Sequence, residues 1–203
     1  HSLTKYIGGH GTSIGGIVVD GGNFDWTKNR KRQPLLNEPD QSYGGAVWID
    51  AVPQLTGANI PFVIRLRVVL LRDTGAPLAP FNAWQIIQGL ETVGLRMKQH
   101  CSNAEKVVTF LETQKKVQNV IYPTNHQGEI KERAKKYMQG GYGSLVGMDV
   151  GTKENGAKFI DNLKMLYHVA NIGDARSLAI HPATTTHSQL NEKELLAAGV
   201  TPG

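Results

Sequence analysis

Helical spacing of apolar residues is the clearest pattern in the sequence, and it occupies two stretches. In residues 61–74, apolar residues recur at helical spacing with three arginines between them, and Asp-Thr-Gly at 73–75 supplies a stop signal. Residues 80–113 continue this spacing well beyond the usual helix length, with Pro80 near the start and glycines at 89 and 94. We therefore expect two helices, the second of which bends or breaks where two domains join.

The rest of the pattern alternates between strands and helices. Beyond the second helix we expect a strand at 117–122, a helix at 129–138, a strand at 144–150, a helix at 153–164 and a strand at 166–170. This alternation predicts an α/β sandwich. Near the start, a short β-branched run bounded by glycines predicts a buried strand at 17–20. Residues 21–59 are polar and weakly periodic, which predicts a long loop or irregular insertion.

Charge and composition narrow the possible partners. The chain has 203 residues, 40% of them hydrophobic, and a formal net charge of +5, of which four cations lie within residues 28–32. No aromatic residue interrupts that run, so it is typical of a solvated loop rather than a nucleic-acid site. Arginines interrupt the most apolar stretch, which argues against a membrane span. A single cysteine, Cys101, excludes an internal disulfide, and we expect a cytoplasmic protein without nucleic-acid or membrane partners.

One lysine near the start stands out chemically. Lys5 follows two hydroxyl residues, Ser2 and Thr4, and precedes a run of glycines that predicts a turn. An amine that is confined on such a turn and partly removed from water can form a Schiff base, and pyridoxal 5'-phosphate (PLP) is the common cofactor of that chemistry. The alternative is an ordinary surface lysine.

The surrounding motifs resemble a known family. Ser-Leu-Thr-Lys-Tyr-Ile-Gly-Gly-His-Gly-Thr at 2–12 resembles the cofactor-lysine segment of the Cys/Met-metabolism PLP-dependent enzymes, and in particular their O-acetylhomoserine sulfhydrylase branch. Further matches follow in the same order, at residues 22–26, 80–83, 88–92, 171–175, 181–183 and 186–188. The resemblance spans nearly the whole chain, and family members are about twice as long, so we expect a C-terminal portion of such an enzyme.

The resemblance implies a fold and an assembly. The fold would be α/β, of the PLP-dependent aspartate-aminotransferase type (fold type I). Residues 1–95 would form the end of the large PLP-binding domain, and residues 96–203 a truncated, smaller C-terminal α/β domain. Family members form homotetramers, built as dimers of dimers with shared active sites, and take small-molecule amino-acid substrates.

The resemblance also implies an activity: γ-replacement on O-acetylhomoserine by sulfide or a thiol, which gives homocysteine or methionine and acetate. The alternatives are the methionine γ-lyase and cystathionine γ-synthase or lyase types, which share the cofactor lysine. A hypothesis from outside the enzymes is a non-catalytic binding fragment that uses the basic loop. An assay of the complete protein with the different substrates separates the enzyme types, and retained absorbance of the lysine-bound cofactor would argue against the binding fragment.

Individual residues take roles accordingly. Lys5 would be the catalytic and cofactor-binding lysine, and Ser2 and Thr4 would bind the cofactor phosphate. Asn171 stands where other branches usually have a serine near the substrate carboxylate, so we expect it to bind substrate. His10 is ambiguous between a turn and a pocket residue. We expect Asp174 and Glu91 to be structural, Cys101 to be a small buried residue, and His181 and His187 not to form a metal site.

Overall fold

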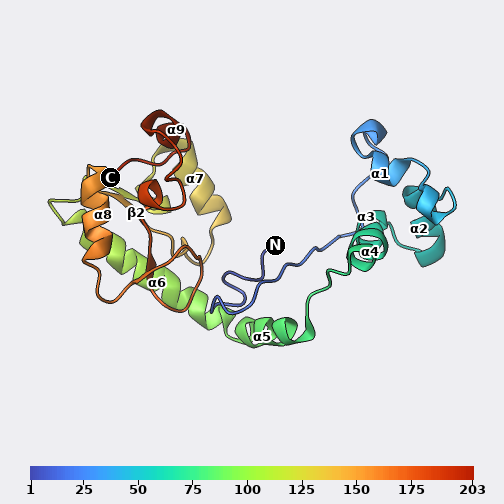
Figure 1. Cartoon of the computed structure of the whole chain (residues 1–203), viewed down its shortest axis with the longest axis horizontal. Helices are drawn as coiled ribbons and strands as arrows, with labels where there is room; N and C mark the ends of the chain where they lie inside the picture. Colours follow the sequence, from blue (N-terminus) through green and yellow to red (C-terminus); the bar gives the residue numbers. More distant parts are fainter. The chain divides into compact units, whose positions relative to one another are not determined.

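The computed structural model describes residues 1–203 and divides into two compact units, each described here by itself (Figure 1). The first unit comprises His1–Ser2 and Gly15–Ala83, and the second comprises Leu3–Ile14 and Trp84–Gly203. Secondary structure is mixed α/β. The division at residue 95 concerns the domains of a protein of full family length, and it stays a prediction.

The first unit is built from short helices around one apolar cluster. Their bounds are η1 Arg30–Arg32, α1 Pro34–Asn37, η2 Gln41–Tyr43, α2 Trp48–Thr56, α3 Pro61–Arg65, the π-helical η3 Leu66–Leu71 and α4 Arg72–Thr74. The last three elements run without a gap and end at Gly75, which has φ +65°, so the predicted helix at 61–74 is confirmed. No single helix is long and apolar enough to span a membrane; only α2 taken with Pro61–Thr74, a pair bent by 98°, has that length and composition.

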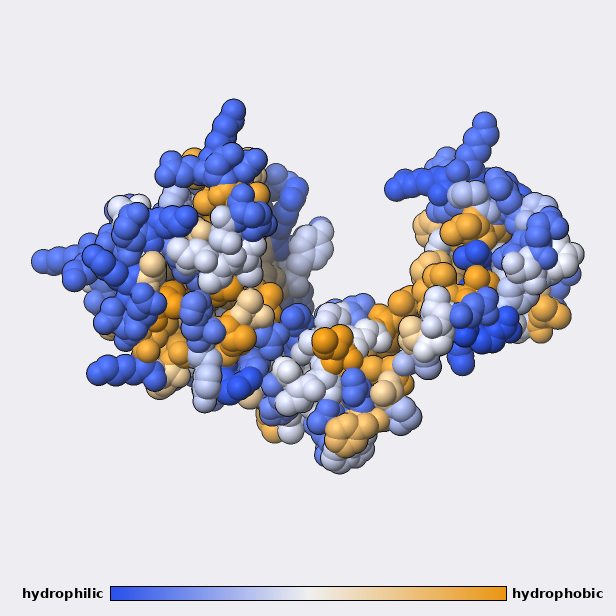
Figure 2. All heavy atoms as spheres, in the orientation of Figure 1, coloured by the Kyte–Doolittle hydropathy of each residue, from blue (hydrophilic) through white to orange (hydrophobic).

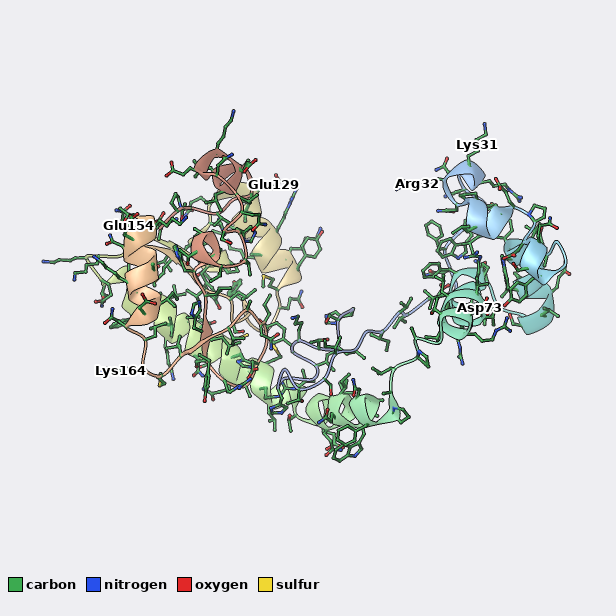
Figure 3. All side chains as sticks on the ribbon, viewed as in Figure 1. Lys31, Arg32, Asp73, Glu129, Glu154 and Lys164 are labelled. Atoms are coloured by element: carbon green, nitrogen blue, oxygen red, sulfur yellow. The ribbon has the colours of Figure 1, made fainter.

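The predicted long irregular segment at 21–59 is wrong in part. Residues 21–29 are irregular, but α1 and α2 form further along, because Leu36, Trp48 and Val52 are buried in one cluster rather than because of a long periodic pattern. On the face drawn in Figure 2, hydrophilic side chains surround η1 and apolar ones lie toward the middle of the unit. The basic run at 28–32 is exposed, as predicted, with Lys31 and Arg32 at the outer end of the unit (Figure 3).

The predicted buried strand at 17–20 does not form. Its three apolar residues are exposed, Val19 by 81%. Only a single antiparallel bridge, between Ser2 and Gly16, precedes it, closed by hydrogen bonds between His1 and Ile17. A strand needs a continuous partner, and no other segment of residues 1–203 pairs with residues 18–20.

The second unit follows the predicted alternation of strands and helices. Its helices are α5 Pro80–Glu91, whose first turn belongs to the first unit, α6 Val93–Glu112, η4 Pro123–Asn125, α7 Gly128–Tyr137, α8 Lys153–Asp161, η5 Pro182–Thr184 and α9 Glu192–Ala197. Strand β1 Asn119–Ile121 pairs antiparallel with β2 Gly147–Asp149, and β3 Tyr167–His168 pairs parallel with β4 Leu178–Ala179. The predicted elements at 117–122, 129–138, 144–150, 153–164 and 166–170 are confirmed, with most of them shorter than expected.

A buried cluster joins α6 to β1. It contains Ala104, Val108, Val120 and Tyr122, and the last of these is 1% exposed and donates its hydroxyl to the carbonyl of Gly143 over 2.9 Å. Burial raises the pKa of Tyr122 to about 12, so the hydroxyl stays a neutral donor. Cys101 is buried on α6 and free, as predicted.

The long helical pattern at 80–113 breaks as predicted, at Thr92, which has φ −106° and ψ 2°. Just before the break, Gly89 is buried on α5 and faces the turn that carries Lys5. A Cβ at this position would overlap the carbonyl oxygen of Gly8 and lie 2.6 Å from that of Ile7. Only glycine therefore lets the turn approach the helix this closely.

Replacing Gly89 by alanine tests this packing. We expect Gly89→Ala to lower the free energy of unfolding by about 1–3 kcal/mol, because the turn must move away from α5. Gly94→Ala is the matched control, since a Cβ there meets nothing within 4 Å. That change should be neutral or stabilise α6 by up to about 1 kcal/mol. Urea unfolding of both variants measures the difference, and equal values would contradict the close approach at Gly89.

Candidate active site

Lys5 lies on a tight hydrogen-bonded turn, as predicted. The amide of Gly8 donates to the carbonyl of Leu3 over 2.9 Å, and the amide of Gly9 donates to the carbonyl of Lys5 over 2.7 Å. Gly9 is buried with φ +76°, and a Cβ there would lie 2.5 Å from the guanidinium carbon of Arg96. The glycines after Lys5 thus supply both the backbone conformation and the space for a neighbouring arginine.

Arg96 of α6 clamps this turn to the break between α5 and α6. Its guanidinium donates to the carbonyls of Tyr6 over 2.7 Å, of Ile7 over 3.1 Å and of Gly89 over 2.6 Å, and its Nε donates to the hydroxyl of Thr92 over 3.1 Å. A guanidinium offers five donors in a rigid plane, which suits several carbonyls at once. The sequence analysis missed Arg96, because its partners are backbone groups far away in the sequence.

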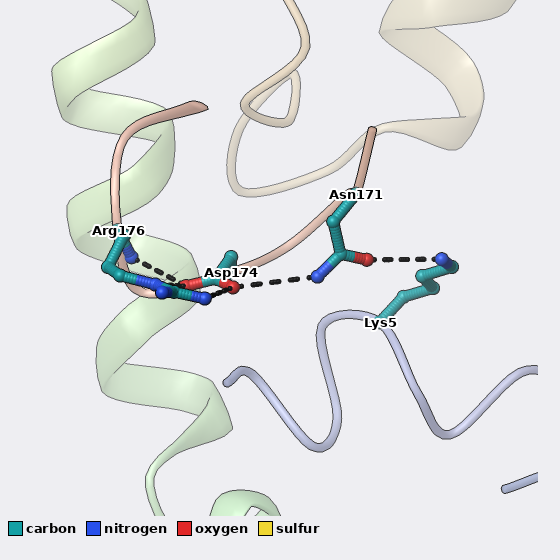
Figure 4. A network of polar contacts seen from close by, with 4 residues as sticks. All are labelled: Lys5, Asn171, Asp174 and Arg176. Carbon is teal, nitrogen blue, oxygen red and sulfur yellow. Dashed lines mark hydrogen bonds and ion pairs between the residues drawn. The ribbon is translucent and has the colours of Figure 1, made fainter. Parts of the chain in front are cut away.

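A second segment holds the other side of the turn. The amide of Ala175 donates to the carbonyl of Gly9 over 2.8 Å, which brings residues 171–176 against the turn. There the amine of Lys5 donates to Oδ1 of Asn171 over 3.1 Å (Figure 4). Two of the predicted site residues, separated by most of the chain, are thus in contact.

Behind Asn171 lies an ion pair whose carboxylate is buried. The Asn171 amide nitrogen donates to Oδ2 of Asp174 over 3.5 Å, and Arg176 donates to Asp174 through its backbone N, its Nε and its Nη2 over 2.8–3.0 Å. The side chain of Asp174 is only 1% exposed. The hydrogen bonds from Arg176 lower its pKa to about 2 against the opposing effect of burial. Asp174 is structural, as expected, and it also connects to Lys5 through Asn171.

His100 adds an aromatic side chain beside the turn. Its ring lies edge-on to that of Tyr6, with the ring centres 6.0 Å apart. Burial, and then the cation of Arg96, lower the pKa of His100, while Asp174 opposes this shift. The imidazole is therefore neutral at neutral pH.

The predicted phosphate ligands are not brought together around a large cavity. Thr4 and His10 line a cavity of about 10 Å³ with Ser13 and Gln85, which has room for about one water molecule. Ser2 is exposed and belongs to the first unit, and its backbone pairs with Gly16. The roles of Ser2 and Thr4 as phosphate ligands stay predictions, and His10 lies beside the turn in the lining of the same small cavity.

The side chains around Lys5 fit a lysine that binds a carbonyl cofactor. Lys5 is partly buried, and its amine is held by an acceptor on a turn that its following glycines make possible. This is the arrangement that a Schiff-base lysine requires. The small cavity beside Thr4 cannot enclose a pyridine ring. The second unit therefore supplies only the lysine end of such a site.

Comparison with known proteins identifies the class. Residues 1–203 match the model of the Cys/Met metabolism PLP-dependent enzymes, and the chain belongs to that family. An O-acetyl-L-homoserine sulfhydrylase from Leptospira meyeri is 49% identical over 100% of this chain and 47% of its own length. The chain spans about half the length of the curated relatives that it matches.

Solved structures agree with this assignment. A Campylobacter jejuni structure described as an O-acetylhomoserine (thiol)-lyase, with a pyridoxyl-lysine monophosphate, superposes with a TM-score of 0.83 at 39% identity, covering 100% of this chain and 47% of its own. Cystathionine gamma-lyase from Lactobacillus plantarum shares the fold at 24% identity, with a TM-score of 0.71 over 100% of this chain and 43% of its own.

Removing the Arg96 clamp should loosen the Lys5 turn. Arg96→Met leaves the carbonyls of Tyr6, Ile7 and Gly89 without their donor, which costs roughly 1–3 kcal/mol for each buried group. We expect faster hydrogen exchange at the amides of Gly8 and Gly9. The exposed Lys98→Met on the same helix is the control and should leave that exchange unchanged. Unchanged exchange in Arg96→Met would show that the turn is held by other contacts.

The ion pair of Asp174 predicts a pH-dependent stability. Its pKa is about 2 in the folded chain and near 3.9 when unfolded, so its stabilisation is complete above about pH 5 and is lost as pH falls toward 2. Asp174→Asn should therefore lower the free energy of unfolding by about 2 kcal/mol at pH 7, with the difference shrinking below pH 4. Denaturant unfolding across this range measures it, and a constant difference would argue against the ion pair as its source.

Proposed function

We propose that the protein carrying this chain is an O-acetylhomoserine sulfhydrylase that uses Lys5 as its cofactor lysine. It converts O-acetylhomoserine and sulfide, or a thiol, to homocysteine or methionine and acetate. The observation that carries the proposal is the amine of Lys5 held 3.1 Å from Oδ1 of Asn171, on a turn fixed by Arg96. The sulfhydrylase from Leptospira meyeri, 49% identical over the whole chain, supports this activity over others of the family.

The chemistry divides between cofactor and chain. PLP, when bound, supplies an electron sink that makes the Cα and Cβ protons of the amino acid acidic. Lys5 holds the cofactor covalently and, once freed by substrate, moves those protons. Asn171 has a second amide N–H beyond the one directed at Asp174, and this N–H would donate to the substrate carboxylate. Ser2 and Thr4 would hold the phosphate by their hydroxyls.

The wider assignments follow from the same proposal. The fold is of the aspartate-aminotransferase type (fold type I), with residues 1–95 in the large PLP-binding domain and residues 96–203 in the small domain. The assembly is a homotetramer built as a dimer of dimers, and the substrates are small amino acids. A cytoplasmic location rests on Cys101, which is buried and unpaired. Because the chain spans about half the length of its relatives, these assignments apply to a protein of their full length.

Trapping the lysine tests the proposal directly. Borohydride reduction of the PLP-loaded, full-length protein, followed by peptide mass spectrometry, should place a pyridoxyl group on Lys5. Lys5→Ala should lose the label and lower the rate by at least about 10³-fold, because the proton-transfer group is removed. Lys98→Ala, which replaces an exposed lysine, should keep the label on Lys5 and the wild-type rate. A label on another lysine of the full-length protein would reject the assignment of Lys5.

The products separate the proposed activity from its relatives. With O-acetylhomoserine and sulfide, we expect homocysteine and acetate in equal amounts. Methionine and cystathionine should turn over slowly. If 2-oxobutanoate is the main product, the protein is of the γ-lyase type, and γ-replacement is rejected even if Lys5 carries the label.

A further inference from the structure

The side-chain amide of Asn171 lies between two charged groups. On one side its oxygen accepts from the amine of Lys5 over 3.1 Å, and on the other its nitrogen faces Oδ2 of Asp174 over 3.5 Å (Figure 4). The ionised carboxylate is an acceptor only, whereas the lysine amine is a donor only when protonated and can also accept when neutral. Turning the amide over would direct its oxygen at the carboxylate, which is repulsive whichever form the amine has. The carboxylate therefore selects one orientation of the amide, and the protonated amine favours the same one.

The carboxylate at the far end is fixed by its own contacts. Arg176 gives it three hydrogen bonds of 2.8–3.0 Å, and its side chain is 1% exposed. Gly11, at φ +65°, packs over the same place, where a Cβ would lie 3.0 Å from the Asn171 nitrogen and 3.2 Å from the Asp174 oxygen. Three hydrogen bonds from Arg176 and the close backbone of Gly11 therefore hold the carboxylate in one direction.

Arg176 has a different position from its partner. Its side chain is 51% exposed, and its guanidinium lies 5.1 Å from the centre of the Tyr167 ring. It contacts Asp174 but makes no hydrogen bond to Asn171 or Lys5. The carboxylate, not the arginine, therefore determines which end of the amide faces the amine.

We propose that Asp174 is a positioning residue for Lys5: by orienting the amide of Asn171, it presents an acceptor oxygen that holds the lysine amine in place. The inference rests on the proposed function, because the position of the amine matters only if Lys5 reacts with the cofactor. Its consequence is that the ion pair is more than a structural brace. Loss of the carboxylate should slow the reactions of Lys5 even where the fold is intact.

Three variants separate positioning from bracing. Asp174→Asn keeps the shape but offers Asn171 either a donor or an acceptor, so the amide loses its fixed orientation. Arg176→Gln breaks the same ion pair but leaves the carboxylate, and Arg176→Lys keeps the cation. If the ion pair only stabilises the fold, the rates at which Lys5 reacts should fall equally in Asp174→Asn and Arg176→Gln. If Asp174 positions Lys5, these rates should fall more in Asp174→Asn and stay near the wild-type values in Arg176→Lys.

The readouts are made on the full-length protein with PLP. The first is the rate at which the apoprotein forms its linkage to PLP, followed by absorbance, and the second is kcat with O-acetylhomoserine and sulfide. At pH 8 we expect the linkage rate and kcat to fall by about tenfold to a hundredfold in Asp174→Asn, which is the size of effect that a misplaced reacting group produces. In Arg176→Gln both should fall by less than about threefold. Thermal unfolding of each apoprotein confirms that the variants are folded at the assay temperature.

A pH profile gives an independent readout. Without Arg176, the pKa of the Asp174 carboxyl is no longer held low, so Asp174 takes up a proton as pH falls and can then donate to Asn171. The linkage rate of Arg176→Gln should fall between pH 8 and pH 5 more steeply than that of the wild type. His100 interacts electrostatically with Asp174 and also titrates, so the profile is repeated with His100→Gln in both backgrounds, while the titration of Lys5 is common to Arg176→Gln and the wild type. This readout stands even if Asp174→Asn does not fold.

The outcomes keep the two proposals apart. If borohydride does not label Lys5 in the wild type, the proposed function fails. If the wild type is labelled but Asp174→Asn forms the linkage at the wild-type rate, or loses no more than Arg176→Gln, the positioning role is wrong and the function stands. Parallel pH profiles for Arg176→Gln and the wild type also overturn the positioning role.

Discussion

The site depends on the docking of a glycine-rich turn against the break between two helices. Folding this turn removes the carbonyls of Tyr6 and Ile7 from water, and an unpaired buried carbonyl costs on the order of 1–3 kcal/mol. Arg96 supplies the missing donors, and Gly89 supplies the space. Neither residue suffices alone, because a guanidinium cannot reach carbonyls that a Cβ on α5 holds away. The position of Lys5 follows from these two residues together.

The turn is held from two sides by segments far apart in the sequence. Arg96 lies 90 residues after Tyr6, and Asn171 lies 166 residues after Lys5. The arginine fixes the backbone, and residues 171–176 fix the side chain of the lysine. Arg96 therefore holds the turn through its backbone alone, whereas residues 171–176 hold it through one backbone hydrogen bond, from Ala175 to Gly9, and also hold the reactive nitrogen through Asn171.

Many elements of both units were predictable from sequence, and the reasons for the failures are physical. The helices at 61–74 and 80–113 show their apolar pattern locally, and the glycines after Lys5 predict a turn without any distant partner. A strand depends on its partner, so residues 17–20 have strand composition without a strand. Helix α2 depends on the burial of Trp48 and Val52, which no short window reveals. The assignment of Lys5 and Asn171 to one site came from family resemblance, whereas their direct contact, the role of Arg96 and the link through Asp174 could be found only in the structure.

The choice of an amide at position 171 explains why a buried carboxylate accompanies it. A serine hydroxyl, which the resemblance gives to other branches of the family, rotates and can donate or accept as its neighbour requires. An amide has two chemically different ends, and an amide with no second partner could present either of them to Lys5. Asp174 removes that freedom, and the hydrogen bonds from Arg176 lower the pKa of its carboxyl, which favours the ionised form. The side chains of Asn171, Asp174 and Arg176 therefore act together. The amide has to be oriented, and the carboxylate, held by the arginine, orients it.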